Sequence, residues 1–170
     1  LVPAKRLIAN VEGAMNAVQV QGDAVGTTLY YGKGAGAEPT ASAVIADLVD
    51  VSRLQSADPA HRVPHLAFQP GSVVNTTIMP MGEVTTSYYL RLRVADVAGV
   101  LADITRVLAD NGISIDAMLQ REAGDGENQT DLIMLTHETK EKNILAAIAK
   151  IESLKTVEGS VTKIRLENLS

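Results

Sequence analysis

Two short loops carry residue types that could bind small charged molecules, and the first is residues 32–40 (GKGAGAEPT). Three glycines and two alanines stand there between a predicted strand and a predicted helix. They let a ligand approach the backbone, and the unpaired N–H groups of a helix N-terminus favour an anion such as a dinucleotide phosphate. The segment is neither a Walker A loop nor a GxGxxG fingerprint, so the pattern alone favours a tight strand-to-helix turn.

The second loop is residues 96–101 (DVAGVL), also between a strand and a helix. Asp96 could cap the helix, and Gly99 would expose backbone N–H groups to a carboxylate. We expect residues 114–116 (SID) to begin the neighbouring strand of the sheet. An amino acid offers a carboxylate and an ammonium group, which N–H groups on one side and an aspartate on the other would match. A plain N-terminal cap by Asp96 remains an equally open interpretation.

The elements that position the first loop are two strands and a helix. Turn signals and apolar runs predict strands at residues 15–20 and 27–31, then a helix from about Pro39 to residues 55–58. One face of this helix carries Ala41, Val44, Ile45, Leu48 and Val51. Residues 61–81 have no period and three prolines, so we expect an ordered connector. The apolar residues expected to pack it onto something are Val63, Leu66, Phe68, Val73 and Val74.

The second loop belongs to a clearer pattern. Its predicted elements are a strand at 88–94, a helix at 100–108, a strand at 113–119, a turn at 123–128, a strand at 132–136, a helix at 140–154 and a strand at 161–166. The helix at 140–154 shows an apolar face of Ile144, Leu145, Ile148 and Ile151. This β-α-β-β-α-β order is the ferredoxin-like arrangement. The predicted fold class is therefore α+β, with a partial mixed sheet and a long helix in residues 1–80 and a ferredoxin-like domain in residues 81–170.

Composition excludes several classes of protein. The 170 residues are 46% hydrophobic and 3% aromatic, carry a net charge of −5 and contain no cysteine. These values exclude disorder, a disulfide scaffold and a cysteine zinc site, and they argue against nucleic acid as a partner. No apolar run reaches the roughly 20 residues of a membrane span, and no signal-peptide pattern opens the chain, so we expect a cytoplasmic protein.

Catalytic and metal signals are weak throughout the chain. His61, His65 and His137 share no metal-ligand spacing with carboxylates. No serine, histidine and aspartate set has the pattern of a catalytic triad. We therefore predict neither a catalytic residue nor a metal site in these residues.

At this point the sequence resembles two known families. Residues 31–44 (YGKGAGAEPTASAV), with residues 16–18 (NAV), Gly26 and residues 47–48 (DL), resemble the end of the catalytic portion of bacterial homoserine dehydrogenase. Residues 96–101 and 111–115 (NGISI) resemble an ACT domain, a small regulatory amino-acid sensor. The longer form of homoserine dehydrogenase carries an ACT domain in this same order, and together the two resemblances cover nearly the whole chain.

The first resemblance implies a parent enzyme, an oxidoreductase that interconverts homoserine and aspartate 4-semialdehyde with NADP or NAD, on the route to threonine and methionine. The residues it places at the bound dinucleotide are Gly34, Ala35, Gly36 and Glu38. The GxGxxG nucleotide unit, the catalytic lysine and the acidic residues that hold homoserine are missing from this sequence. We therefore expect a C-terminal fragment that is inactive alone and does not hold the cofactor stably.

The second resemblance implies feedback regulation, with threonine as the expected effector and a homo-oligomer formed through the edges of the ACT sheets. The positions that match effector contacts are Asp96, Gly99, Val100, Leu101, Ser114 and Asp116. Many amino-acid-binding members have proline where Ala98 stands, so this loop is less rigid than theirs. Two alternatives stay open: a stand-alone amino-acid-binding module without catalytic activity, and a dimerisation tail that binds no effector.

Overall fold

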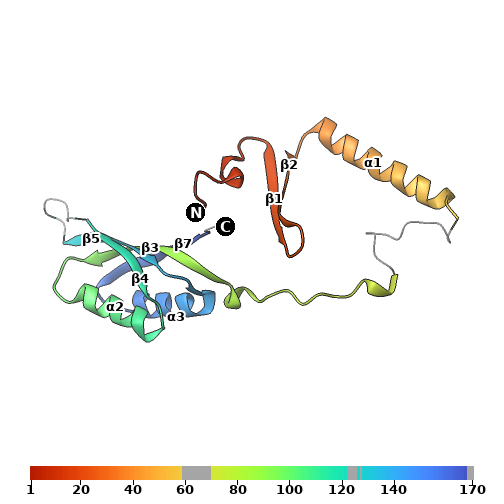
Figure 1. Cartoon of the computed structure of the whole chain (residues 1–170). Coiled ribbons are helices and arrows are strands. Elements are labelled where there is room, and N and C mark those ends of the chain that lie inside the picture. The colour runs from red at the N-terminus through yellow and green to blue at the C-terminus, as the bar shows by residue number, and fades with distance from the viewer. Residues whose placement is uncertain (59–69, 122–125, 127, 168–170) are drawn as a thin grey trace. The chain divides into compact units, whose positions relative to one another are not determined.

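The structure is a computed structural model that describes residues 1–58, 70–121, 126 and 128–167. The chain forms two compact units, each considered by itself below. One is Ala4–Thr77, and the other combines Leu1–Pro3 with Ile78–Ser170. Figure 1 shows the elements of both units in chain order, from the red hairpin to the blue final strand.

The first unit is a hairpin followed by a long helix. After a short 3-10 turn, η1 (Leu7–Asn10), the strands β1 (Met15–Gly22) and β2 (Gly26–Lys33) pair antiparallel, with Met15 opposite Lys33. Helix α1 (Ala37–Ser56) follows and begins two residues before the predicted start. Proline in its first turn costs no hydrogen bond, because a first-turn N–H has no intrahelical partner. The predicted strands and helix are confirmed.

The apolar side chains of this unit stay exposed. No described residue between Ala4 and Thr77 is buried, and helix α1 shows its whole apolar face. Between the 3-10 turns η3 (Pro70–Ser72) and η4 (Met81–Glu83), Val73 and Val74 are 59% and 73% exposed. No described residue covers these two valines, so the packing expected of them is not seen within this chain. The other apolar connector residues, Val63, Leu66 and Phe68, lie outside the described residues.

The second unit is a sheet with two helices on one face (Figure 1). Its elements are β3 (Thr85–Ala95), α2 (Val100–Asp110), β4 (Ile115–Gln120), β5 (Gln129–Thr136), α3 (Glu141–Glu152) and β7 (Val157–Leu166). The strand order is β4-β5-β3-β7, and every neighbouring pair is antiparallel. The predicted ferredoxin-like fold is confirmed. The two-residue strand β6 (Thr139–Lys140) beside the start of β3 was not predicted. Most of the predicted turn at 123–128 lies outside the described residues.

Alternation along the central strands builds a dry core. Every second residue of β3 and β5 faces the helices, and α2 and α3 close the core with side chains three and four residues apart. The core cluster comprises Tyr88, Leu90, Leu92, Val94, Val100, Ile104, Leu108, Ile113, Leu132, Met134, Ile144, Ala147, Ile148, Ile151 and Val161. Leu145 was predicted on the inner face of α3, but it is exposed, and Ala147 takes the inner position.

The end of α2 explains why the next strand begins late. Asn111 is its C-cap, and Gly112 has a φ of 70°, a left-handed conformation that glycine adopts without steric cost. The Ile113 N–H then donates to the Leu108 carbonyl at 3.0 Å, and the Ile113 side chain enters the core. Strand β4 therefore starts at Ile115 rather than at Ile113. Across the described residues, no helix is both long and apolar enough to cross a membrane.

Candidate functional site

The Gly-rich loop joins β2 to α1 through two glycines, Gly34 beside the Asn16 side chain and Gly36 in a conformation that favours glycine. Gly36 is the N-cap of α1 with a φ of 125°, a conformation that L-residues rarely adopt. A Cβ atom on Gly34 would lie 2.0 Å from Asn16 Nδ2. The Thr40 N–H donates to the Gly36 carbonyl at 3.1 Å. Because proline has no N–H, the groups left open at the start of α1 are the N–H groups of Ala37 and Glu38.

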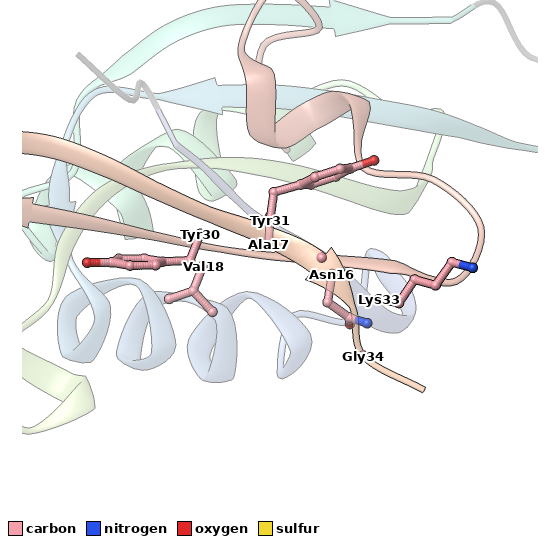
Figure 2. Close-up of a pocket in the computed structure, with 8 residues that line it drawn as sticks. Asn16, Ala17, Val18, Tyr30, Tyr31, Lys33 and Gly34 are labelled. Carbon is pink, nitrogen blue, oxygen red and sulfur yellow. The ribbon is translucent and has the colours of Figure 1, made fainter. Parts of the chain in front are cut away.

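Beside this loop the twisted hairpin forms a shallow hollow (Figure 2). Its lining residues are Asn16, Ala17, Val18, Tyr30, Tyr31, Gly32, Lys33 and Gly34. Val18 pairs with Tyr30 and Ala17 with Tyr31, so the two tyrosines project from opposite faces of the hairpin. Asn16 was not predicted as a site residue. The hairpin register brings it to Gly34, because Met15 pairs with Lys33.

In the second unit, Gly99 rather than Asp96 is the N-cap of α2. Gly99 has a φ of 97°, and no side chain caps the helix. The Asp96 N–H donates to the Asn128 carbonyl at 2.9 Å, which places Asp96 at the end of β3. The interpretation of Asp96 as a plain helix cap is therefore wrong. Since the Asp103 N–H makes the first helical bond, to the Gly99 carbonyl, the N–H groups of Val100, Leu101 and Ala102 precede it.

Ser114 and Asp116 lie far from that loop within one chain. Strand β5 separates β3 from β4, so the expectation that residues 114–116 run directly beside the loop is wrong. Ala95 pairs with Gln129 at one end of β5, and Ile115 pairs with Thr136 at the other end. Gln129 and Thr136 are seven residue steps apart along β5, about 23 Å at 3.3 Å per step. The connection from β3 through α2 to β4 leaves room for one strand between β3 and β4, and β5 occupies that position.

His137 joins the Ser114 and Asp116 group, although its sequence pattern assigned it no role. Its N–H donates to the Ser114 carbonyl at 2.9 Å, and its Nε2 lies 3.8 Å from Asp116 Oδ1. Both side chains are more than half exposed, so the pair is weak by itself. The signal that could have found it is the pairing of β4 with β5, which sets the end of β5 beside the start of β4.

Several side chains with shifted pKa values form an ionic cluster at the start of α3. The buried Glu141 carboxylate accepts hydrogen bonds from Tyr88 Oη at 2.7 Å, from Arg165 Nε at 2.8 Å and from Lys163 Nζ. The hydrogen bond from Arg165 lowers the pKa of Glu141 to about 2, against the opposing effect of burial. Burial, with the hydrogen bond to Glu141, raises the pKa of Tyr88. These groups contact one another rather than an open cavity, so the cluster is structural.

The fold and the loop at the start of α2 define the class of the second unit. The family model described as ACT domain matches residues 88–156. This match agrees with the ferredoxin-like strand order and with the glycine-started helix after β3. The second unit is an ACT domain.

The comparisons extend to the whole chain. The family model described as Homoserine dehydrogenase matches residues 1–49. The homoserine dehydrogenase of Neisseria gonorrhoeae is 54% identical over 99% of this chain and 39% of its own length. That of Pseudomonas aeruginosa is 51% identical over 100% of this chain and 39% of its own length. A crystal structure of a homoserine dehydrogenase from Thiobacillus denitrificans has 67% identity and a TM-score of 0.85, over 99% of this chain and 38% of that one.

The chain is therefore homologous along its entire length to homoserine dehydrogenases, and it includes an ACT domain. Both predicted resemblances are confirmed. The chain spans about two-fifths of the length of the curated relatives that it matches.

Proposed function

We propose that this chain is the C-terminal portion of a homoserine dehydrogenase and that its ACT domain regulates the enzyme. The observation that carries this proposal is the similarity along the whole chain, in which a homoserine dehydrogenase segment precedes an ACT domain. In this proposal residues 1–80 complete the catalytic and dimerisation domain and form the connector, and residues 81–170 form the regulatory domain. The parent enzyme interconverts homoserine and aspartate 4-semialdehyde in the cytoplasm. The similarity along residues 1–49 disfavours a stand-alone amino-acid-binding module.

The exposed apolar surfaces of the first unit support this assignment. A helix with an apolar face is stable in water when that face packs against another element. In α1 that face is open to solvent, as is the hollow of the hairpin. We propose that the remaining part of the enzyme covers both surfaces. The chain alone is then expected to be inactive, because hydride transfer requires a nicotinamide held against the substrate. Homoserine-dependent reduction of NAD or NADP by the purified chain would contradict this.

We propose that Gly34, Ala35, Gly36 and Glu38 lie against NADP or NAD in the parent enzyme. The residues fit this role, because Gly34 and Gly36 leave the backbone bare at the start of α1 and Gly36 has a φ of 125°, a conformation that favours glycine. The nicotinamide supplies the hydride acceptor or donor. This loop supplies close backbone approach, two open N–H groups at the start of α1, and the Glu38 carboxylate as an acceptor for hydroxyl groups.

A rescue experiment in the full-length enzyme tests the loop. Gly34→Ala is expected to raise the KM for the cofactor about tenfold, a loss of about 1.4 kcal/mol in binding. The same methyl group also collides with Asn16. The double variant Asn16→Ala/Gly34→Ala removes that collision and is expected to keep the raised KM. Full recovery in the double variant would show that the loop is only a tight turn.

We propose that the effector is threonine and that its site forms between two copies of the ACT domain. The two groups of predicted residues lie at opposite ends of β5, so one copy contributes residues 96–101 and another contributes Ser114 and Asp116. The effector carboxylate meets the N–H groups near Gly99 and Val100, and its ammonium meets Asp116 or Asp96. Strand β4 has a free edge with Met118 and Leu119 exposed, and pairing such edges is the proposed basis of the oligomer.

Titration with amino acids tests this site. The wild-type enzyme is expected to bind threonine in preference to isoleucine, methionine and lysine. Asp116→Ala removes a charge-assisted hydrogen bond, with an expected loss of roughly 1.5–3 kcal/mol, about tenfold or more in affinity. Feedback inhibition weakens in parallel, while uninhibited turnover is retained. Asp110→Ala, an equal change of charge at the end of α2, is the matched control. An ACT domain that stays monomeric at high concentration, or unchanged inhibition of Asp116→Ala, would refute the shared site.

A further inference from the structure

The polypeptide passes between the two units at two places, after Pro3 and before Ile78. The first passage is held on the outer edge of the ACT sheet. The Leu1 nitrogen donates to the Arg165 carbonyl, and the Glu167 N–H donates to the Leu1 carbonyl at 2.9 Å. Two bonds to residues two apart along one strand are a β-type pairing. Leu1 and Glu167 consequently lie side by side.

The second passage is held at the start of α3. Glu83, in the 3-10 turn before β3, accepts hydrogen bonds from Lys140 Nζ and Lys142 Nζ, both at 2.7 Å. Its pKa is lowered to about 2, chiefly by the hydrogen bond from Lys140, so it stays ionised at neutral pH. The Glu141 N–H donates to the Val84 carbonyl at 2.9 Å. Two lysines and a backbone bond therefore fix the chain as it enters β3.

One short group of residues contacts the second passage directly and the first through Arg165. We call Lys140, Glu141 and Lys142, at the start of α3, the junction. Its lysines hold Glu83 on the second passage, and the Glu141 carboxylate holds Arg165, whose carbonyl bonds Leu1 on the first passage. A displacement of the junction would therefore move both passages.

The junction is also tied to one half of the proposed effector site. The His137 N–H donates to the Ser114 carbonyl at 2.9 Å, and its ring faces Asp116 at 3.8 Å. Lys140 lies three residue steps after His137, a span of at most about 10 Å. Strand β6 within that span pairs with Thr85 and Thr86, the first residues of β3. The path from Asp116 to Glu83 therefore runs through the 3.8 Å contact with His137, the backbone from His137 to Lys140, and the ion pair of Lys140 with Glu83.

We propose that the junction couples the effector site to the rest of the enzyme: occupation of Asp116 displaces His137 and Lys140, and Lys140 moves Glu83 and the passage before β3. The proposal rests on the proposed function of the ACT domain as a regulator. Coupling of this kind needs a contact that differs between two states. In this proposal the contact that differs between the two states is that of Lys140 and Lys142 with Glu83, because an exposed ion pair can rearrange at a low cost in free energy.

The first test uses the full-length enzyme with Glu83→Gln. This variant keeps the shape of the side chain and loses the charge that both lysines hold. Threonine binding, measured by calorimetry, is expected to stay within about twofold of wild type. The threonine concentration for half inhibition is expected to rise at least about fivefold, the lower range of allosteric coupling. Glu138→Gln, the same charge change in an exposed residue two positions before Lys140, is expected to change neither value. Equal inhibition of Glu83→Gln and wild type would overturn the proposal.

The second test needs no effector and uses hydrogen exchange of the 170-residue chain. If the junction is coupled to the effector half-site, Glu83→Gln accelerates exchange of the His137 amide at least about fivefold, and Glu138→Gln does not. An unchanged His137 amide in Glu83→Gln would overturn the proposal even if no amino acid binds. Failure of wild-type enzyme to bind threonine would instead overturn the proposed function, so the two failures are distinguishable.

Discussion

The two units contain similar helical and strand patterns but use them differently. In the ACT domain the inner faces of β3, β5, α2 and α3 cover one another, and Leu90 is 0% exposed. In Ala4–Thr77 no described residue covers the apolar face of α1, and Leu48 is 62% exposed. Amphipathic periodicity thus indicates a helix or strand face that packs against another element. It does not indicate whether that other element belongs to the same 170 residues.

The largest expected difference between the units is in native-state hydrogen exchange. Amides of α1 are expected to exchange at least about 10³-fold faster than those of Leu90 and Leu92, because a dry core opens only by global unfolding. The measurement is exchange followed by NMR or mass spectrometry on the 170-residue chain. The same α1 amides are expected to become protected in the full-length enzyme. Equal protection of α1 and β3 in the chain alone would remove the contrast.

Matched truncations sharpen the comparison at single residues. Leu90→Ala leaves a cavity in the core and is expected to lower the free energy of unfolding by about 2–5 kcal/mol. Leu48→Ala removes the same atoms from an exposed position and is expected to change it by less than about 0.5 kcal/mol. Urea unfolding of the two variants measures both values. A large effect of Leu48→Ala would show that α1 is packed in solution.

The ionic cluster makes the ACT domain sensitive to acid. Glu141→Gln is expected to cost about 2–3 kcal/mol, less than a fully buried pair, because Lys163 and Arg165 partly reach solvent. The pKa of Glu141 falls from 4.5 to about 2 on folding, so its contribution is complete above pH 4.5 and is lost as pH falls towards 2. Wild type is therefore expected to lose stability in this window more steeply than Glu141→Gln.

Two controls belong to this prediction. Glu138→Gln removes the same charge from an exposed side chain and is expected to leave the acid dependence unchanged. Glu83, whose pKa is lowered by Lys140 and Lys142, adds a slope of the same sign, so a residual acid dependence should remain in Glu141→Gln. A stability profile of Glu141→Gln that matches wild type between pH 4.5 and 2 would show that the cluster does not stabilise the fold.

The smallest expected effect is that of alanine at two glycines with nearly the same φ angle. Gly112 has a φ of 70° and Gly26 a φ of 71°, and a Cβ atom would touch nothing within 4 Å at either position. Alanine therefore adds only backbone strain, about 1 kcal/mol. Gly112→Ala, at the end of α2, is expected to shift the unfolding midpoint of the ACT domain. Gly26→Ala, in the hairpin, is expected to leave it unchanged. An equal shift in both variants would show that the two units unfold together.

Local patterns predicted most elements of both units. Alternation identified β3 and β4, three-and-four spacing identified α1 and α2, and Asn111-Gly112 marked the end of α2. These patterns did not predict features that depend on packing or pairing with another element. Leu145 and Ala147 both fit a helical face of α3, and only the packing placed Ala147 inside. The two-residue strand β6 has no pattern of its own, because β3 creates it by pairing.

The candidate sites divide in the same way. The sequence by itself determined the fold class, the two resemblances and the loops where glycine must precede a helix, because these depend on residues close together along the chain. Only the tertiary structure decided that β5 separates Asp96 from Asp116, that Gly34 packs on Asn16, and that Glu83, Glu141 and Arg165 meet at the start of α3. The physical reason is that strand order and ionic contacts between distant residues arise from the packing of complete elements, which no local pattern of side chains encodes.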